Sequence, residues 1–258
     1  MFLEKIIAAK KRETEQLKKI HPLPVLREKA EALPPARDFR KALADSPCAI
    51  IAEIKKSSPS KGILAEDFDP AGFASAYAQG GAAAISVLTE RMFFAGHPEH
   101  VREVKTATGL PVLRKDFILE EWQVCESRVL GADAVLLIAA LLDEQRLRSL
   151  IRDVERLGMT PLVEIHSGEE LETAASAGAG VIGINNRDLV TFHTDIEVSI
   201  GISARIPPGI ISVSESGIRS RTDIERLLSC GIRAFLVGEA LVRSRDKIQK
   251  LKELLGKK

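Results

Sequence analysis

Hydrophobic residues along this chain alternate between short unbroken runs and stripes at helical spacing. The run at 49–54 is rich in branched residues, which is typical of a buried strand. Residues 143–157 instead carry apolar side chains three and four positions apart, behind the acidic residue Asp143, and this pattern predicts an amphipathic helix. Further helices are predicted over 167–177, 222–228 and 239–255.

Glycines that close a helix and precede a short apolar strand recur at a spacing of about fifty residues. One series is Gly81, Gly131, Gly178 and Gly231, and a second series, Gly109, Gly158 and Gly209, lies between its members. Two interleaved series imply one strand-plus-helix unit in about 25 residues. With the strand at 49–54 included, the chain contains eight predicted strands.

Alternating strands and helices favour a parallel sheet covered by helices, and eight units favour its closed form. We therefore predict the α/β class, with a (β/α)8 TIM barrel as a single domain over residues 46–258. An open doubly wound sheet is the alternative, but the first strand–helix turn lacks Gly-x-Gly-x-x-Gly. Residues 1–45 have too few apolar residues for a core of their own, so we expect an N-terminal helical extension packed on the barrel, with a short helix at 38–44.

Composition and charge exclude several functional classes. The chain has 258 residues, 45% of them hydrophobic, and a net charge of +1, which gives no electrostatic footprint for nucleic acid or a membrane surface. The longest apolar run, 134–142, is too short to span a bilayer. The N-terminus shows no apolar signal segment, and the three cysteines lie far apart. We therefore expect a cytoplasmic protein without disulfides or a structural metal.

Polar residues collect at the carboxyl end of nearly every predicted strand, where barrels of this kind carry their sites. Glu53 and Lys55 leave the same side of the first strand, and Lys115 ends the third. Two-residue pairs also end the fifth and sixth strands, Glu164 with His166 and Asn185 with Arg187. Charged groups converging on one rim without a function would cost too much desolvation, so we predict an active site there.

Other polar residues near these strand ends have simpler interpretations. We expect Glu90 and Glu215 to be ordinary solvated or ion-paired charges, and His166 to be a hydrogen-bonded histidine near the rim. Arg114 and Asp116 alternate with Lys115 along the strand, so we expect them to face the helices.

The last two strand ends predict a phosphate site. Ser216-Gly217 follows the seventh strand and Gly238-Glu239 follows the eighth. Small residues let backbone N–H groups approach an anion closely, and the phosphate site of (β/α)8 barrels is built from these two loops. Lys55, on the adjacent first strand, would add positive charge.

Six motifs in order along the chain resemble the indole-3-glycerol phosphate synthase family. They are AEIKKSSPS (52–60), LRKDF (113–117), LVEIH (162–166), IGINNRDL (182–189), SESGI (214–218) and LVGEAL (236–241). The resemblance covers nearly the whole chain, including the N-terminal extension. It implies a carboxy-lyase of tryptophan biosynthesis that converts 1-(2-carboxyphenylamino)-1-deoxyribulose 5-phosphate to indole-3-glycerol phosphate, carbon dioxide and water.

The resemblance also implies catalytic roles. Lys115 corresponds to the general acid that protonates the sugar carbonyl oxygen, and we expect partial desolvation to lower its pKa. Glu164 corresponds to the general base, oriented or stabilised by neighbours that include Glu53. Lys55 has two possible roles, as a phosphate ligand or as a second acid in the dehydration.

The remaining implied residues bind substrate. Asn185 and Arg187 would hold the sugar hydroxyls and the carboxylate region, and Pro59 and Phe117 would pack against the anthranilate ring together with the end of the fourth strand. The phosphate ligands would be Ser216, Gly217, Gly238 and the backbone of Glu239, with Lys55. The reaction requires no metal or redox cofactor. The expected partner is a phosphorylated small molecule, with no nucleic acid and no membrane, and a monomer is the simplest assembly.

Two rival functions remain to be weighed. The phosphoribosylanthranilate isomerase family is also a phosphate-binding barrel, but it uses a cysteine at the end of strand one and an aspartate at the end of strand six. Here Glu53 and Asn185 occupy those ends, and Cys48 lies at the opposite end of its strand. A non-catalytic phosphosugar-binding barrel would have lost the acid–base residues, but Lys115 and Glu164 are both present.

Overall fold

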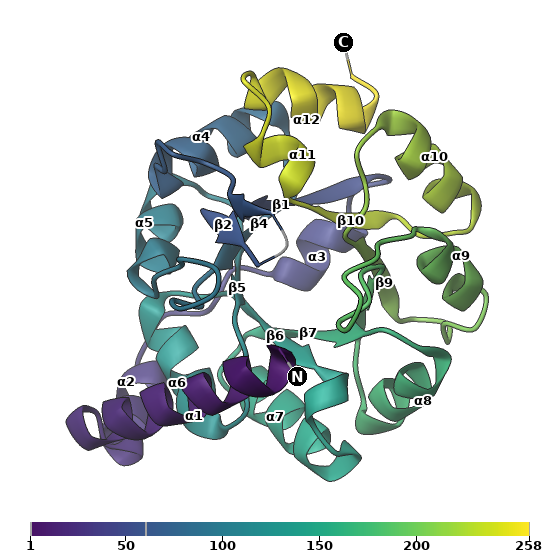
Figure 1. Cartoon of the computed structure of the whole chain (residues 1–258). Helices are drawn as coiled ribbons and strands as arrows, with labels where there is room; N and C mark the ends of the chain where they lie inside the picture. The colour runs from purple at the N-terminus through teal and green to yellow at the C-terminus, as the bar shows by residue number, and fades with distance from the viewer. Residues whose placement is uncertain (1, 60, 258) are drawn as a thin grey trace.

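Eight parallel strands form a closed barrel in the computed structural model, which describes residues 2–59 and 61–257 (Figure 1). Within these residues the barrel strands are β1 (Ala49–Ile54), β4 (Ala84–Leu88), β5 (Val112–Lys115), β6 (Ala134–Ile138), β7 (Thr160–Ile165), β8 (Val181–Asn185), β9 (Ile211–Glu215) and β10 (Ala234–Val237). Each pairs with its neighbours in chain order, and β10 closes the ring on β1. The predicted (β/α)8 barrel is confirmed, and the open sheet is excluded.

Helices surround the barrel (Figure 1). They are α4 (Pro70–Gly80), α5 (Glu99–Ala107), α6 (Glu121–Leu130), α7 (Glu144–Arg156), α8 (Gly168–Ala177), α9 (Glu197–Ser203), α10 (Arg221–Ser229), α11 (Glu239–Val242) and α12 (Lys247–Leu255), with a 3-10 turn at Ala139–Leu141. The predicted single helix over 239–255 is wrong. The helix stops after Val242, and the Asp246 carboxylate accepts a hydrogen bond from the Gln249 N–H and so starts α12 as a separate helix.

Apolar side chains fill two layers, one inside the barrel and one between its strands and the helices. The inner layer includes Ile51, Leu113 and Leu162 from three different strands. The predicted short helix before the first strand is α3 (Phe39–Ala44), which adds Phe39 and Leu43 to the same inner cluster and is capped by the Asp38 side chain. Apolar side chains therefore fill the amino-terminal half of the barrel, as is typical of this fold.

The connection between β1 and α4 is not a featureless loop. It contains a two-stranded antiparallel ribbon, β2 (Ser57–Ser58) with β3 (Gly62–Ile63). The Lys56 carbonyl accepts a hydrogen bond from the Leu64 N–H at 2.8 Å and closes the base of this ribbon.

No helix among the described residues is long and apolar enough to cross a membrane.

Two helices precede α3, namely α1 (Phe2–Ile20) and α2 (Leu23–Glu31). In Figure 1, α1 runs across α6 with its amino end near the barrel mouth. The buried ammonium of Lys10 lies 2.9 Å from the Asp116 carboxylate just beyond β5, and Asp116 in turn pairs with Arg114 at 3.1 Å. This buried ionic chain ties the N-terminal helix to the strand end that carries Lys115.

Replacement of Lys10 by alanine removes the cation that α1 supplies to this chain. We expect Lys10→Ala to lower the free energy of unfolding by about 3 kcal/mol, because the buried Asp116 carboxylate loses one of its two cationic partners. Urea denaturation measures the change. Lys11→Ala, at an exposed position of the same helix, should stay within about 0.5 kcal/mol of the parent. Equal effects of the two substitutions would show that α1 is held by other contacts.

Candidate active site

A cavity of about 480 Å³ opens at the carboxyl ends of the barrel strands. All the site residues predicted from the sequence line it, namely Glu53, Lys55, Pro59, Lys115, Phe117, Glu164, Asn185, Arg187, Ser216, Gly217, Gly238 and Glu239. Leu3 and Ile6 of α1 also contribute to the wall, although neither was predicted to do so. The N-terminal helix is therefore part of the site.

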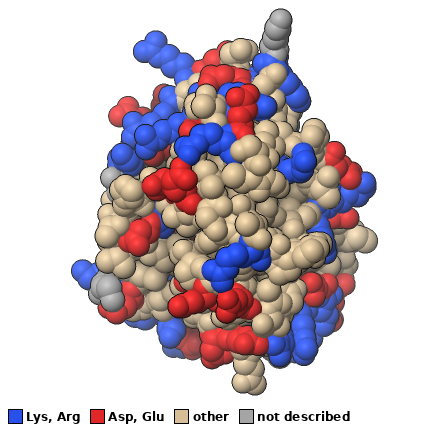
Figure 2. Space-filling model, turned by 90° about the vertical axis from the view of Figure 1, so that its right-hand side faces the viewer, with Lys and Arg blue, Asp and Glu red and all other residues tan. Residues whose placement is uncertain are grey.

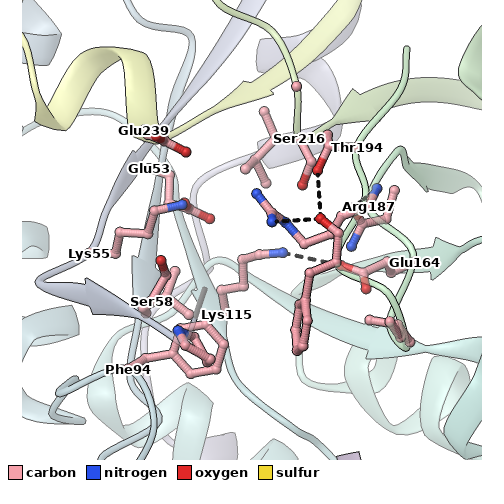
Figure 3. A pocket seen from close by; sticks show the side chains of 18 of the residues that line it. Glu53, Lys55, Ser58, Phe94, Lys115, Glu164, Arg187, Thr194, Ser216 and Glu239 are labelled. Carbon is pink, nitrogen blue, oxygen red and sulfur yellow. Dashed lines mark hydrogen bonds and ion pairs between the residues drawn. The ribbon is translucent and has the colours of Figure 1, made fainter. Parts of the chain in front are cut away.

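Lys115 lies at the centre of this cavity (Figure 3). Its ammonium is 3.1 Å from the carboxylate of Glu164 and 3.1 Å from that of Glu215. Burial by itself would lower the pKa of Lys115, but the negative charges of Glu164, Glu215 and Glu53 outweigh it and raise the pKa above its ordinary value. The expected lowering is therefore wrong in sign, since three carboxylates surround one ammonium.

Glu215 is the important residue that our sequence analysis did not assign to the site. It is an ion-paired charge, as we expected, but it is only 1% exposed and points into the barrel from the end of β9. Burial raises the pKa of Glu215 to about 7, and the nearby carboxylates of Glu164 and Glu53 act in the same direction against Lys115. Alternation along β9 contained the signal, because Val213 belongs to the inner layer and Glu215 is two residues later.

Glycine on the neighbouring strand provides space for the Glu215 side chain. A Cβ atom at Gly183 of β8 would lie 2.0 Å from Oε1 of Glu215. Gly238 serves the same purpose after β10, where a Cβ would lie 2.1 Å from Oε1 of Glu53 and 2.9 Å from Nζ of Lys55. Bulk at either position would displace a charged group of the site.

Glu53 and Lys55 form an ion pair on one wall of the cavity. Burial would raise the pKa of Glu53, but Lys55 and Lys115 together lower it, so this carboxylate is ionised. The Lys55 ammonium is directed toward the turn that contains Gly238. Positive charge therefore adjoins the predicted anion site.

Glu164 lies between two cationic groups. Burial would raise its pKa, but Lys115 and His166 lower it, and Asn185 also donates a hydrogen bond to it. Nε2 of His166 is 3.4 Å from Glu164, and Nδ1 is 3.4 Å from Glu170. Burial opposes protonation of this imidazole, but the two carboxylates raise the pKa of His166. Glu164 is thus held as an unprotonated carboxylate, which is the form that a base requires.

The loop after β8 carries Arg187 into the cavity (Figure 3). The Asn185 side chain accepts a hydrogen bond from the Arg187 N–H at 3.0 Å, and the guanidinium donates to the Phe192 carbonyl at 3.3 Å. These two contacts orient the Arg187 guanidinium, and both are made to residues close to it in the chain.

The predicted phosphate turns follow the neighbouring strands β9 and β10, and both line the cavity. Ser216 and Gly217 both have positive φ angles, 66° and 82°. A Cβ at Gly217 would lie 2.8 Å from the methyl group of Thr194. Both this lack of space and the positive φ angle favour glycine at this position. Gly238 immediately precedes α11. Neither glycine carries a side chain of its own that would cover the backbone N–H groups of its turn.

An apolar wall lies beside the charged groups. It includes Phe117, Leu136 and Ile138, and Phe94, whose ring centroid is 6.4 Å from that of Phe117. Phe94 was not predicted, because its loop conformation depends on Glu90. We expected Glu90 to be a solvated or ion-paired charge, but it is buried and accepts hydrogen bonds from backbone N–H groups of its own loop, including that of Phe94 at 3.1 Å.

Arg114 and Asp116 point out of the barrel, as predicted. The Arg114 guanidinium contacts Glu126 of α6 at 2.7 Å, and Asp116 reaches Lys10 of α1. Lys115 lies between them with its side chain inward. One three-residue segment therefore supplies both a site residue and the anchors behind it.

Comparisons with known proteins agree on one family. The family model described as "Indole-3-glycerol phosphate synthase" matches residues 3–254. A curated relative of that name from Carboxydothermus hydrogenoformans is 49% identical over 264 residues, 99% of this chain and 100% of its own. Another, from Chlorobium luteolum, is 45% identical over 247 residues, 95% of this chain and 94% of its own.

Solved structures with low sequence identity share the fold. One is a thiamine phosphate pyrophosphorylase from Pyrococcus furiosus, with a TM-score of 0.61 and 16% identity over 81% of this chain and 94% of its own. This similarity concerns the architecture alone.

Glu215 gives the stability of the fold a particular dependence on pH. Its pKa is about 7 in the folded protein against an ordinary value of 4.5, so the folded protein binds more protons between these values and loses stability as the pH rises through them. Glu215→Gln removes this proton uptake. Urea unfolding at pH 5 and pH 8 should therefore show the variant gaining stability relative to the parent at the higher pH. An unchanged difference at the two pH values would mean that Glu215 titrates normally.

Proposed function

Because this chain belongs to the indole-3-glycerol phosphate synthase family, we propose a division of that reaction among its cavity residues. The reaction joins a ring carbon of 1-(2-carboxyphenylamino)-1-deoxyribulose 5-phosphate to its sugar carbonyl carbon, releases carbon dioxide from that ring carbon, and expels a hydroxyl and a proton as water. It needs an acid at the carbonyl oxygen, a base for the departing proton, and an anion site for the phosphate.

Lys115 is the general acid in this proposal. The observation that supports it is the central position of its ammonium, between Glu164 and Glu215 at 3.1 Å from each. A raised pKa keeps the amine protonated before the reaction begins. Proton transfer is still favourable once bond formation converts the carbonyl oxygen into an alkoxide, because an alkoxide is a much stronger base than an amine.

Glu164 is the general base that removes the proton lost in the dehydration. Its lowered pKa keeps it ionised, and Lys115 and His166 hold it from two sides. Acid and base are therefore adjacent on neighbouring sides of one cavity. Glu53 stabilises the Lys55 ammonium by an ion pair, and Glu215 is the second carboxylate that contacts Lys115.

The phosphate group binds the two small-residue turns, Ser216-Gly217 and Gly238-Glu239. Lys55 supplies the counter-charge in this assignment, because its ammonium adjoins Gly238. Asn185 and Arg187 contact the sugar hydroxyls and the substrate carboxylate. The anthranilate ring then packs on the apolar wall, with Phe117 and Pro59.

We also infer a cytoplasmic monomer with no nucleic-acid partner, built from a helical extension at 1–45 and one barrel domain at 46–258. Basic and acidic side chains are interspersed over the face seen in Figure 2, which suits a small-molecule enzyme better than a polyanion-binding surface.

Lys115→Met removes the ammonium and keeps most of the side-chain volume. We expect turnover to fall by about 10²-fold or more, with substrate binding largely retained, because the acid acts in the chemical step. Formation of indole-3-glycerol phosphate is followed by indole absorbance after addition of the substrate. Lys41→Ala, at the exposed Lys41–Asp45 pair, is the control. A variant with nearly normal turnover would remove the assigned role.

Glu164→Gln keeps the shape of the base and removes its charge. We expect single-turnover experiments to show normal substrate binding and a chemical step slowed by about 10²-fold or more. The acidic limb of the kcat–pH profile should also disappear, because ionisation of this carboxylate is then no longer required. A defect confined to binding would contradict the assignment.

A further inference from the structure

Asn186 is a buried amide directly behind the site. It follows β8 between Asn185 and Arg187, which line the cavity, and it is only 2% exposed. Its Nδ2 group donates to Oγ of Ser214 at 2.9 Å and to the carbonyl oxygen of Ser216 at 3.0 Å. Its Oδ1 accepts from the N–H and the hydroxyl of Ser199, at 3.0 and 2.8 Å. Both donors and both lone pairs of the amide are used.

The main chain of Asn186 also binds the segment that contains Ser214 and Ser216. Its N–H donates to the Glu215 carbonyl at 2.9 Å. One residue therefore binds three consecutive positions, through the Ser214 hydroxyl, the Glu215 carbonyl and the Ser216 carbonyl. Among the described residues, Ser216 is one of three non-glycine residues with positive φ, a conformation that surrounding contacts must maintain.

The hydrogen bond from Asn186 to the Ser216 carbonyl fixes the direction of the Gly217 N–H group. In a trans peptide the carbonyl and the following N–H point in opposite directions. The Ser216 carbonyl points back to Asn186, so the N–H of Gly217 points forward, on the side where Gly217 lines the cavity. Without the amide, this peptide plane is free to rotate.

We propose that Asn186 is a positioning residue that holds the Ser216–Gly217 peptide with its N–H presented to the substrate phosphate. This inference rests on the phosphate site proposed above and adds the residue that sets its geometry. Asn186 touches no substrate atom. It acts through the peptide whose carbonyl it binds, and its effect is greatest on the affinity for phosphorylated ligands.

Ser199 provides a matched control within the same network. Ser199→Ala removes the hydroxyl that donates to Asn186 and lies 2.8 Å from Oγ of Ser214. The Ser199 N–H still reaches Asn186, and both Nδ2 bonds remain. This variant therefore disturbs the buried network but leaves the Ser216 carbonyl attached.

The test compares Asn186→Ala, Asn186→Asp and Ser199→Ala as full-length proteins. Aspartate keeps the size and the acceptor oxygen of asparagine but has no group that donates to the Ser216 carbonyl. For both Asn186 variants we expect KM to rise about tenfold or more, with kcat changed less than about threefold, and the inhibition constant of inorganic phosphate to rise in parallel. Ser199→Ala should lower Tm but leave KM and phosphate inhibition within about threefold.

Each alternative result has a distinct meaning. If inorganic phosphate does not compete with substrate in the parent protein, the phosphate site itself is wrong, and this inference is rejected with it. If phosphate competes in the parent and equally well in a folded Asn186 variant, the site stands but Asn186 does not position it. If Ser199→Ala raises KM as much as Asn186→Ala at a similar loss of Tm, the effect is general loosening, and the positioning role is again rejected. Should Asn186→Ala fail to fold, Asn186→Asp decides the question by the same criteria.

Discussion

The buried cluster of Lys115 with Glu164, Glu215 and Glu53 is the constraint on which the rest of the site depends. Removing four charged groups from water is costly, and a single ammonium cannot neutralise three carboxylates. The surrounding carboxylates raise the pKa of Lys115, and burial together with the neighbouring carboxylates raises that of Glu215, while Glu164, which has His166 as a second partner, remains ionised. Glu164 and Glu215 both contact the Lys115 ammonium, but their different surroundings give them different pKa values. Such a difference is typical of acid–base sites.

Barrel closure makes such a cluster possible, and glycine makes it fit. The carboxyl ends of β1, β5, β7 and β9 converge on one axis, where side chains from opposite sides of the ring meet. Below them, the inner apolar layer and α3 fill the barrel. At the level of the charges, Gly183 and Gly238 lack the Cβ atoms that would collide with Glu215 and Glu53. The motif glycines on β8 and just after β10 are therefore packing partners of the acidic residues, in addition to any role beside phosphate.

Sequence patterns predicted what depends on local periodicity. The eight strands, the inward direction of Lys115 and the outward direction of Arg114 and Asp116 all follow from alternation within a strand and the spacing of glycines. Properties that depend on which strand ends meet across the ring were not predicted. The direction of the pKa shift at Lys115 depends on how many carboxylates surround it, which the sequence does not show. The position of Glu215 depends on the register of β9 against β8, in which Asn185 pairs with Glu215. The wall residues Leu3 and Ile6 belong to a helix whose position is set by a long-range ion pair, from Lys10 to Asp116.

The same alternation explains how the working side chains are held still. A strand that points one residue inward points its neighbours outward. Beside Lys115, Asn185 and Glu215 these neighbours include polar residues that are hydrogen-bonded or ion-paired, whereas those beside Glu53 and Glu164 are apolar. Arg114 and Asp116 flank Lys115 and bind α6 and α1. Asn186 separates Asn185 from Arg187, and Ser214 and Ser216, which it binds, flank Glu215. The inward groups pair with one another, and the strand ends that carry them are fixed in addition by contacts made behind the strands. Preorganisation of this site is therefore a property of the layer between barrel and helices, and the N-terminal helix, through Lys10, belongs to that layer as much as any helix of the barrel.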